Sequence, residues 1–164
     1  MEFWIQEEFQ RFLECVADKP ISYYAFEMLY WTGIREGELL ALTPADFNFE
    51  KKTLRINKSY QRLEGEDVIT DPKTPKSNRT IVMPDFLVIE MEDFIKSIYG
   101  IEMDDRIFII SKSYLHHEMD RGAKHAGVKR IRIHGLRHSH ISLLINLGFS
   151  ALAIGERVGH EAVD

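Results

Sequence analysis

The spacing of apolar residues limits the fold of this chain more strongly than any other feature of its sequence. Apolar side chains recur at helical intervals along both ends of the chain. Between these ends lie three short stretches that alternate or are β-branched, at 53–57, 67–70 and 79–82. Turn-forming residues join the stretches, so we expect an antiparallel meander. The pattern predicts a mostly helical α+β domain with one small three-stranded antiparallel sheet.

Ordinary start and stop signals bound the helices. Gly33, Gly127 and Gly148 are placed to end helices, and Ser150 is placed to cap the start of the last one. Residues 106–110 are expected to form a brief strand or an extended segment. The predicted helices cover residues 3–17, 20–32, 35–42, 84–99, 113–126 and 134–147, with a last helix from Ser150 through Val158.

Length and composition indicate a single domain. With 164 residues, 45% of them apolar, the chain can bury one sizeable core. No apolar run approaches the ~18 residues that span a bilayer, and the first residues lack the features of a signal peptide. The one cysteine, Cys15, excludes a disulfide framework and is expected to pack in the core. We therefore expect a soluble cytoplasmic protein.

The charges are segregated along the chain. The net charge is −5, which by itself argues against a nucleic-acid partner. Residues 121–140 nevertheless hold six Lys and Arg and no acid, whereas residues 85–105 hold seven acids and one Lys. Such segregation is typical of a protein that binds DNA with one face, although a solvated charge run is the alternative for either block.

Three short strings, set far apart along the chain, carry residue types that bind phosphate. They are T-G-I-R-E-G-E-L-L-A-L around Arg35, I-H-G-L-R-H-S-H with His134 and Arg137, and V-G-H ending at His160. An arginine fork can hold two phosphate oxygens at once. His134 and Arg137, three residues apart, share one helix face. Each string alone is ordinary for a surface helix or a helix cap, but together they predict a cationic pocket for one phosphate.

The order of these strings resembles the catalytic domain of the tyrosine recombinases, the integrase family of phages and conjugative transposons. Two further strings are similar to such integrases, L-L-A-L-T-P-A-D-F-N-F-E-K-K-T-L-R-I-N-K-S-Y and P-K-T-P-K-S-N-R-T-I-V-M-P. The resemblance covers essentially the whole chain and implies a helical catalytic domain that carries a three-stranded sheet. It also implies an enzyme for site-specific DNA recombination, the integration or excision of a mobile element, through a 3′-phosphotyrosine intermediate. Because that intermediate keeps the bond energy, no cofactor is expected.

The resemblance assigns roles to the residues of the three strings. Arg35 and Arg137 would hold the phosphate through their guanidiniums. His134 would exchange a proton with the tyrosine hydroxyl, in keeping with an imidazole that titrates near neutrality. His160 would add a hydrogen bond to the phosphate.

A lysine on a turn between two strands would protonate the leaving 5′ oxygen. Lys73 is the favoured residue, and Lys76 is the alternative; either is an ordinary solvated turn lysine if the assignment fails. The basic residues that we expect to contact DNA are Lys76, Arg79, Lys129, Arg130 and Arg132.

Two residues near these strings are expected to support the arginines. Glu38, three residues after Arg35, either orients the Arg35 guanidinium or forms a simple surface ion pair. His138 stands four residues after His134, a spacing that suits zinc, but no cysteine and no clear third ligand support a metal site. We therefore expect no metal, and we expect His138 and His140 to pack or hydrogen-bond beneath the arginine, as the resemblance implies.

The sequence lacks one residue that the expected reaction requires. The resemblance implies a nucleophilic tyrosine shortly after His160, and the sequence reaches Asp164 without one. We expect residues 1–164 to be a single catalytic domain, truncated before that tyrosine and inactive alone. The N-terminal arm-binding and core-binding domains of such integrases have no counterpart in these residues.

Double-stranded DNA is the expected partner. By analogy with the family, the full-length protein would act as a tetramer on paired sites in bacteria, associated with the nucleoid when bound to DNA. The 164-residue chain would be a monomer that binds DNA weakly. The alternative is a non-catalytic DNA-binding or regulatory module with the same fold. A metal-dependent nuclease is disfavoured, because the acids are not gathered near the basic strings.

Overall fold

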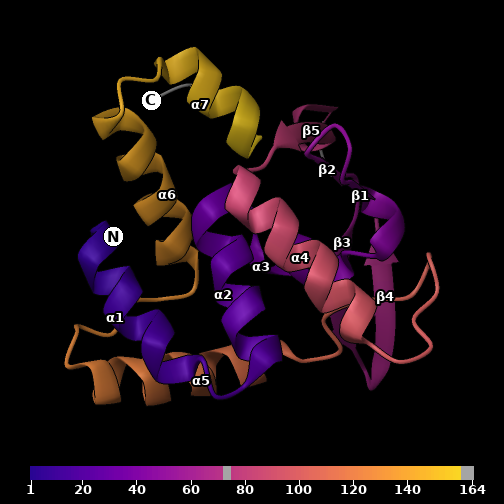
Figure 1. The fold of residues 1–164 in the computed structure, drawn as a ribbon, viewed down its shortest axis with the longest axis horizontal. Helices are drawn as coiled ribbons and strands as arrows, with labels where there is room; N and C mark the ends of the chain where they lie inside the picture. Colours follow the sequence, from indigo (N-terminus) through magenta and orange to yellow (C-terminus); the bar gives the residue numbers. More distant parts are fainter. Residues whose placement is uncertain (72–74, 160–164) are drawn as a thin grey trace.

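The computed structural model describes residues 1–71 and 75–159. Helices make up most of this part of the chain, and short antiparallel strands lie to one side of them (Figure 1). The predicted α+β class is confirmed. The elements, in chain order, are α1 (Gln6–Val16), α2 (Pro20–Thr32), α3 (Glu36–Ala41), η1 (Pro44–Asp46), β1 (Phe47–Asn48), β2 (Thr53–Ile56), β3 (Ser59–Leu63), β4 (Glu66–Thr70), η2 (Pro75–Ser77), β5 (Arg79–Val82), α4 (Asp85–Ser97), α5 (Lys112–Ala126), α6 (His134–Asn146) and α7 (Ala151–Val158).

Helix α2 is the centre of the helical part, in contact with α1, α3, α4 and α6 (Figure 1). Apolar side chains surround it on nearly all sides, which is the pattern of a helix buried within a core. Phe9 of α1 stacks on Tyr30 of α2, with 4.1 Å between the ring centroids. Each fully buried aromatic side chain of this kind stabilises the fold by roughly 1.5–3 kcal/mol. Cys15 is half-buried, so the expectation that it packs in the core was wrong.

The three-stranded sheet has the order β1-β2-β5, and β3 pairs with β4 in a separate two-stranded sheet. The predicted meander was therefore wrong in one of its three strands. Residues 67–70 pair with β3 rather than with β2 or β5. The reason is the turn at Glu64 and Gly65, whose φ angles of 49° and 80° are both positive. Two such residues form the tight hairpin turn that joins adjacent antiparallel strands. Residues 106–110 form no strand.

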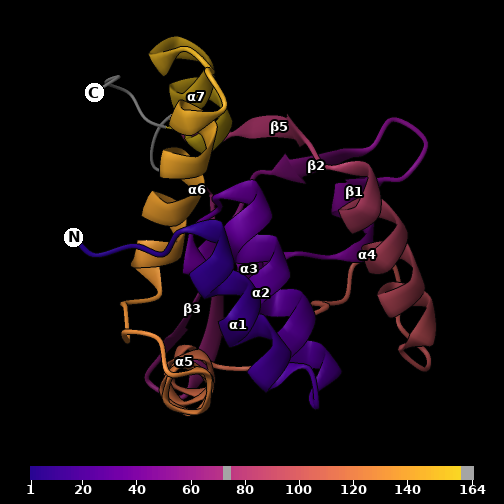
Figure 2. The ribbon, with the colours of Figure 1, turned by 60° about the vertical axis from the view of Figure 1, so that its left-hand side comes forward.

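Several helix ends meet where α6 begins. Helix α2 ends at Gly33 and α7 ends at Gly159, both in the left-handed conformation, and α3 begins directly after Arg35. Figure 2 shows α7 beside both α6 and β5, and the inter-element contacts agree. Helix ends expose unpaired main-chain N–H and C=O groups, so this region offers fixed dipoles to charged side chains. Within the described residues, no helix is long and apolar enough to cross a bilayer.

Candidate phosphate-binding site

A cavity of about 510 Å³ brings together three residues of the predicted phosphate pocket. Arg35 reaches it from the start of α3, and His134 and Arg137 reach it from the first turn of α6. About one hundred residues separate the two contributions along the chain. His160 and Lys73, which were also predicted to belong to this site, lie outside the described residues. The residues that line the cavity are Ile34, Arg35, Glu36, His116, Arg130, Arg132, Ile133, His134 and Arg137.

Main-chain carbonyls at two helix ends hold the Arg137 guanidinium. One of its nitrogens donates a hydrogen bond to the carbonyl of Gly33 at 2.7 Å, and the other donates to the carbonyl of Val158. Arg137 as a whole is 2% exposed. The carbonyl ends of helices carry partial negative charge, so α2 and α7 both favour a cation here. These bonds fix the direction of the guanidinium before any ligand arrives.

Arg137 is also under electrostatic stress. Burial and the nearby charges of Arg35 and Arg79 lower the pKa of Arg137 to about 9, and Glu38 opposes the shift. Burial and the two neighbouring cations penalise the charged form of the guanidinium, whereas a nearby carboxylate favours it. A bound anion would compensate for both the lost hydration and the like-charge repulsion. The site is therefore poised to accept negative charge.

One carboxylate, that of Glu38, serves two arginines. Its Oε1 accepts a hydrogen bond from the main-chain N–H of Arg35 at 2.8 Å, and its Oε2 lies 3.7 Å from the Arg35 guanidinium. Both oxygens also accept hydrogen bonds from Arg79, at 3.1 and 3.0 Å. Glu38 is buried, so the alternative of a simple surface ion pair does not fit the structure. The Glu38 carboxylate thus holds the main chain of Arg35 and lies within ion-pair distance of its guanidinium, and an orienting role for Glu38 stays a prediction.

Arg79 differs from the other residues that we expected to contact DNA. Its side chain is 6% exposed. Besides the two bonds to Glu38, it donates to the main-chain carbonyls of Arg157 and Ser77, each at 2.8 Å. The Arg79 guanidinium is thus directed at a carboxylate and two main-chain carbonyls in the interior.

The remaining basic residues lie on the surface. Arg130 and Arg132 are exposed and line the cavity, and Arg130 pairs with Asp120. Lys129 lies 3.8 Å from a carboxylate oxygen of Glu8, and Lys76 is exposed on η2. Arg130 and Arg132 thus line this cavity where it meets the surface, whereas Lys129 and Lys76 do not line it.

The histidines of α6 have different environments. His134 is exposed at the cavity, and its ring meets the His138 ring edge to face, with 5.2 Å between centroids. Burial, together with the N-terminal amine and Arg137, lowers the pKa of His138. His140 is buried, and its Nε2 accepts a hydrogen bond from Arg157 at 3.0 Å. Among the described residues, no group of three potential ligands is placed to hold a metal ion.

Arg157 does not line the cavity, but it connects the elements around it, and it was not identified from the sequence. Its guanidinium donates to His140, to the carbonyl of Val82 at 2.6 Å and to the carbonyl of Trp31 at 3.0 Å. Burial is the main cause that lowers the pKa of Arg157, and Arg79 adds to it. These contacts join α7 to β5, α2 and α6. The available signal was its place directly before the Val-Gly-His string.

A Glu36–His116 pair on the cavity wall was also missed. One His116 ring nitrogen lies 3.6 Å from a Glu36 carboxylate oxygen. Burial raises the pKa of Glu36, and His116 and Lys112 oppose that shift. No pattern around His116 in the sequence indicated that it would pair with Glu36.

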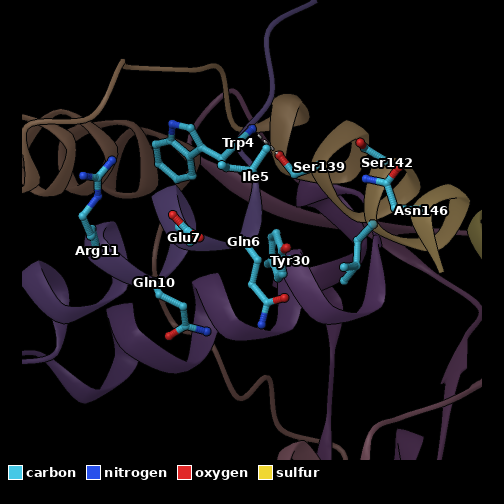
Figure 3. A pocket seen from close by; sticks show the side chains of 11 residues that line it. Trp4, Ile5, Gln6, Glu7, Gln10, Arg11, Tyr30, Ser139, Ser142 and Asn146 are labelled. Atoms are coloured by element: carbon cyan, nitrogen blue, oxygen red, sulfur yellow. Dashed lines mark hydrogen bonds between the residues drawn. The ribbon is translucent and has the colours of Figure 1, made fainter.

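Cavity size alone does not select the site. A larger cavity, of about 690 Å³, lies between α1 and α6, and Figure 3 shows Trp4, Gln6, Gln10 and Asn146 around it. Glu7 and Arg11 are the charged side chains among the residues that line it. Of the predicted phosphate-binding residues that the structure describes, none lines it, so the smaller cavity, where arginines converge, is the candidate site.

The sequence is similar to those of integrases. Residues 3–164 match the phage integrase family. The ICEBs1 integrase of Bacillus subtilis (strain 168) is 29% identical over 177 aligned positions, which cover 99% of this chain and 48% of that protein. The integrase of Staphylococcus phage L54a is 31% identical over 153 positions, covering 83% of this chain and 43% of that protein. The chain spans about half the length of the curated relatives it matches.

The fold is similar to solved structures from the same group. The Tn1549 transposon integrase in complex with circular intermediate DNA superimposes with a TM-score of 0.85 and 23% identity, over 99% of this chain and 60% of that one. The XerA recombinase gives a TM-score of 0.79 with 19% identity, over 99% of this chain and 56% of that one. These likenesses establish the fold, and the sequence match establishes the relationship. The chain belongs to the phage integrase family of tyrosine recombinases.

Proposed function

We propose that this chain is the phosphate-binding catalytic domain of a site-specific DNA recombinase that integrates or excises a mobile element. The observation that carries the proposal is the convergence of Arg35, His134 and Arg137 on one cavity, where the guanidinium of Arg137 is already fixed in direction. The relatives named integrase, and the Tn1549 integrase bound to DNA, support the same function.

The proposed reaction moves a DNA phosphodiester onto a tyrosine hydroxyl. The tyrosine oxygen forms a bond to phosphorus, the bond to the 5′ oxygen breaks, and a 3′-phosphotyrosine remains. Arg35 and Arg137 hold the non-bridging oxygens, on which negative charge accumulates. His134 takes the hydroxyl proton. Since the energy of the broken bond is kept in the phosphotyrosine, the proposal includes no cofactor and no metal.

Two residues outside the described part complete the proposed site. Lys73 donates the proton that the leaving 5′ oxygen requires, with Lys76 as the alternative, and His160 adds a hydrogen bond to the phosphate. The nucleophilic tyrosine and the arm-binding and core-binding domains belong to the proposed full-length protein, not to residues 1–164. Those residues then form a single catalytic domain that is inactive without the tyrosine.

Double-stranded DNA is the proposed partner. Arg130 and Arg132, exposed where the cavity meets the surface, extend the positive surface toward neighbouring phosphates. The proposed working assembly is four protomers on two duplexes in the bacterial cytoplasm, at the nucleoid. The 164-residue chain by itself is proposed to be a monomer that binds DNA weakly and more weakly still as salt rises.

A covalent-adduct experiment tests the proposal. The full-length protein is incubated with a nicked suicide duplex that carries its recombination site, and a denaturing gel is used to look for protein bound covalently to the 3′ end. We expect an adduct that Arg137→Ala abolishes and that Lys96→Ala, which removes an exposed lysine paired with Glu92 in the last turn of α4, leaves unchanged. Failure to form an adduct would favour the alternative, a non-catalytic DNA-binding or regulatory module of the same fold.

A further inference from the structure

Arg79 joins three segments that are far apart in the sequence. It begins β5, and its guanidinium bonds to Glu38 in α3 and to the main-chain carbonyls of Ser77 in η2 and Arg157 in α7. Glu38 lies 41 residues before it and Arg157 lies 78 residues after it. A planar guanidinium has donors that point in several fixed directions, so one side chain can hold all three segments.

Each of these segments leads to a residue of the proposed site. The Glu38 carboxylate accepts the N–H of Arg35, and its other oxygen faces the Arg35 guanidinium. Helix α7, held at Arg157, ends at Gly159, which precedes His160 in the chain. The η2 segment contains Lys76. Arg79 therefore contacts the supports of these residues without lining the phosphate cavity.

The packing at Gly159 shows how closely Arg79 approaches the end of α7. A Cβ atom added to Gly159 would lie 2.9 Å from a terminal nitrogen of Arg79 and 3.2 Å from the main-chain oxygen of Lys76. The φ angle of Gly159 is +79°, a conformation that L residues with a side chain rarely adopt. Both the conformation and the contact disfavour a side chain at this position, so Gly159 packs closely against the Arg79 guanidinium.

We propose that Arg79 is a positioning residue of the recombination site, which holds Arg35 through Glu38 and the end of α7 through the Arg157 carbonyl, and does not itself contact DNA. The proposal rests on the proposed function, because its purpose is to keep Arg35 beside the phosphate that Arg137 binds. We expect that lysine cannot replace arginine at this position. A single ammonium group cannot bond to the Glu38 carboxylate and to both main-chain carbonyls in the same geometry.

The salt dependence of DNA binding separates positioning from contact. A residue that neutralises one phosphate contributes about 0.9 to the slope of log K against log salt, and a residue that contacts no phosphate contributes nothing. The 164-residue chain, Arg79→Met and Arg79→Lys are titrated with a short mixed-sequence duplex at several salt concentrations. Arg62→Met, which removes a well-exposed arginine on β3, is the matched control.

We expect Arg79→Met to lower the affinity roughly tenfold, the loss typical of a residue that orients a ligand-binding side chain, with an unchanged salt slope. Arg79→Lys gives the same loss, because charge alone does not restore the contacts. A slope reduced by about 0.9, or full rescue by lysine, overturns the proposal and restores Arg79 as a DNA contact. The proposed function itself fails on a different result, an unchanged affinity in both Arg35→Met and Arg137→Met.

A second variant and a second measurement guard against loss of the fold. Arg79→Met with Glu38→Gln removes both charges of the buried pair, so neither Glu38 nor Arg79 is left as a charge without the other. Amide hydrogen exchange in the free protein then reports on α7 without any DNA. We expect faster exchange at the last turn of α7 in both variants, with α4 unchanged as the internal reference. Unchanged exchange at the end of α7 contradicts the proposal whatever the DNA titration gives.

Discussion

Arg137 donates a hydrogen bond to the main-chain carbonyl of Gly33 across 104 residues of sequence, at a distance of 2.7 Å. This bond ties the first turn of α6 to the end of α2, and the second bond of Arg137, to Val158, ties both to the end of α7. The guanidinium is thus aimed by carbonyls whose own positions depend on two left-handed glycines, Gly33 and Gly159. The two hydrogen bonds that direct the Arg137 guanidinium therefore also hold α2, α6 and α7 together.

Arg137→Ala should therefore lower both DNA affinity and stability. Removal of the guanidinium leaves the carbonyls of Gly33 and Val158 buried without a donor, which costs about 1–3 kcal/mol for each unsatisfied group. Relief of the repulsion from Arg35 and Arg79 offsets part of that cost. Denaturant unfolding gives the free energy, and a duplex titration gives the affinity. Wild-type values in both measurements would show that these bonds contribute nothing.

Gly33→Ala should destabilise the fold more than Gly127→Ala does. Both glycines end a helix with positive φ, at +71° and +67°, so both variants incur the strain of roughly 1–2 kcal/mol of a left-handed residue with a side chain. A Cβ at Gly33 would also lie 2.5 Å from the His140 ring, whereas nothing lies within 4 Å of one at Gly127. Urea midpoints of the two variants measure the difference. Equal losses would mean that the ring moves aside freely.

Glu27 should make the protein less stable as pH rises toward 8. Burial, with the charge of Glu90, raises the pKa of Glu27 from 4.5 to about 8 in the folded state. Between these values the unfolded chain has released the proton and the folded chain keeps it, so the free energy of unfolding falls with pH. The loss is complete above about pH 8.

The matched variant for this effect is Glu27→Gln, which has no proton to lose. Chemical denaturation from pH 5 to pH 9 should show the stability of the variant gaining steadily on that of the wild type as pH rises. Parallel curves for the two proteins would contradict the raised pKa of Glu27.

Glu118 should make the protein less stable as pH falls, which is the opposite of the effect of Glu27. Arg121, Ser22 and Lys19 favour its carboxylate and lower its pKa in the folded state, and the residue is buried. Its stabilising effect is present above the unfolded pKa and is lost as pH falls through the lower, folded value. Glu118→Gln should cost about 1–3 kcal/mol at neutral pH and progressively less in acid. A cost that does not change with pH would point to packing rather than charge.

The helices were predictable from sequence because their signals are local. Gly33 and Gly127 end α2 and α5 as expected, and the Ser150 side chain accepts a hydrogen bond from the Ala153 N–H at the start of α7. The pairing of β3 with β4 was not predicted, because along β3 one residue, Tyr60, is buried and no alternation marks the strand. A strand without a buried face carries little pattern.

The site was predictable to the extent that residue type decides it. The strings around Arg35 and Arg137 indicated a shared cationic pocket, and both side chains line one cavity. The burial of Arg79 was not predictable, since it depends on Glu38 and Arg157, which are distant in sequence and close only in the fold. A basic residue beside a phosphate-binding string looks the same whether it contacts DNA or holds its neighbours.

The central claim is that Arg35 and Arg137 hold the same phosphate, and the salt dependence of the double variant tests it most directly. Arg35→Met, Arg137→Met and the double variant are titrated with a DNA duplex over a range of salt concentrations. If the two arginines share one phosphate, the double variant loses a single contact, and the slope of log K against log salt falls by about 0.9. A fall of about twice that value would mean two separate phosphates and would contradict the account.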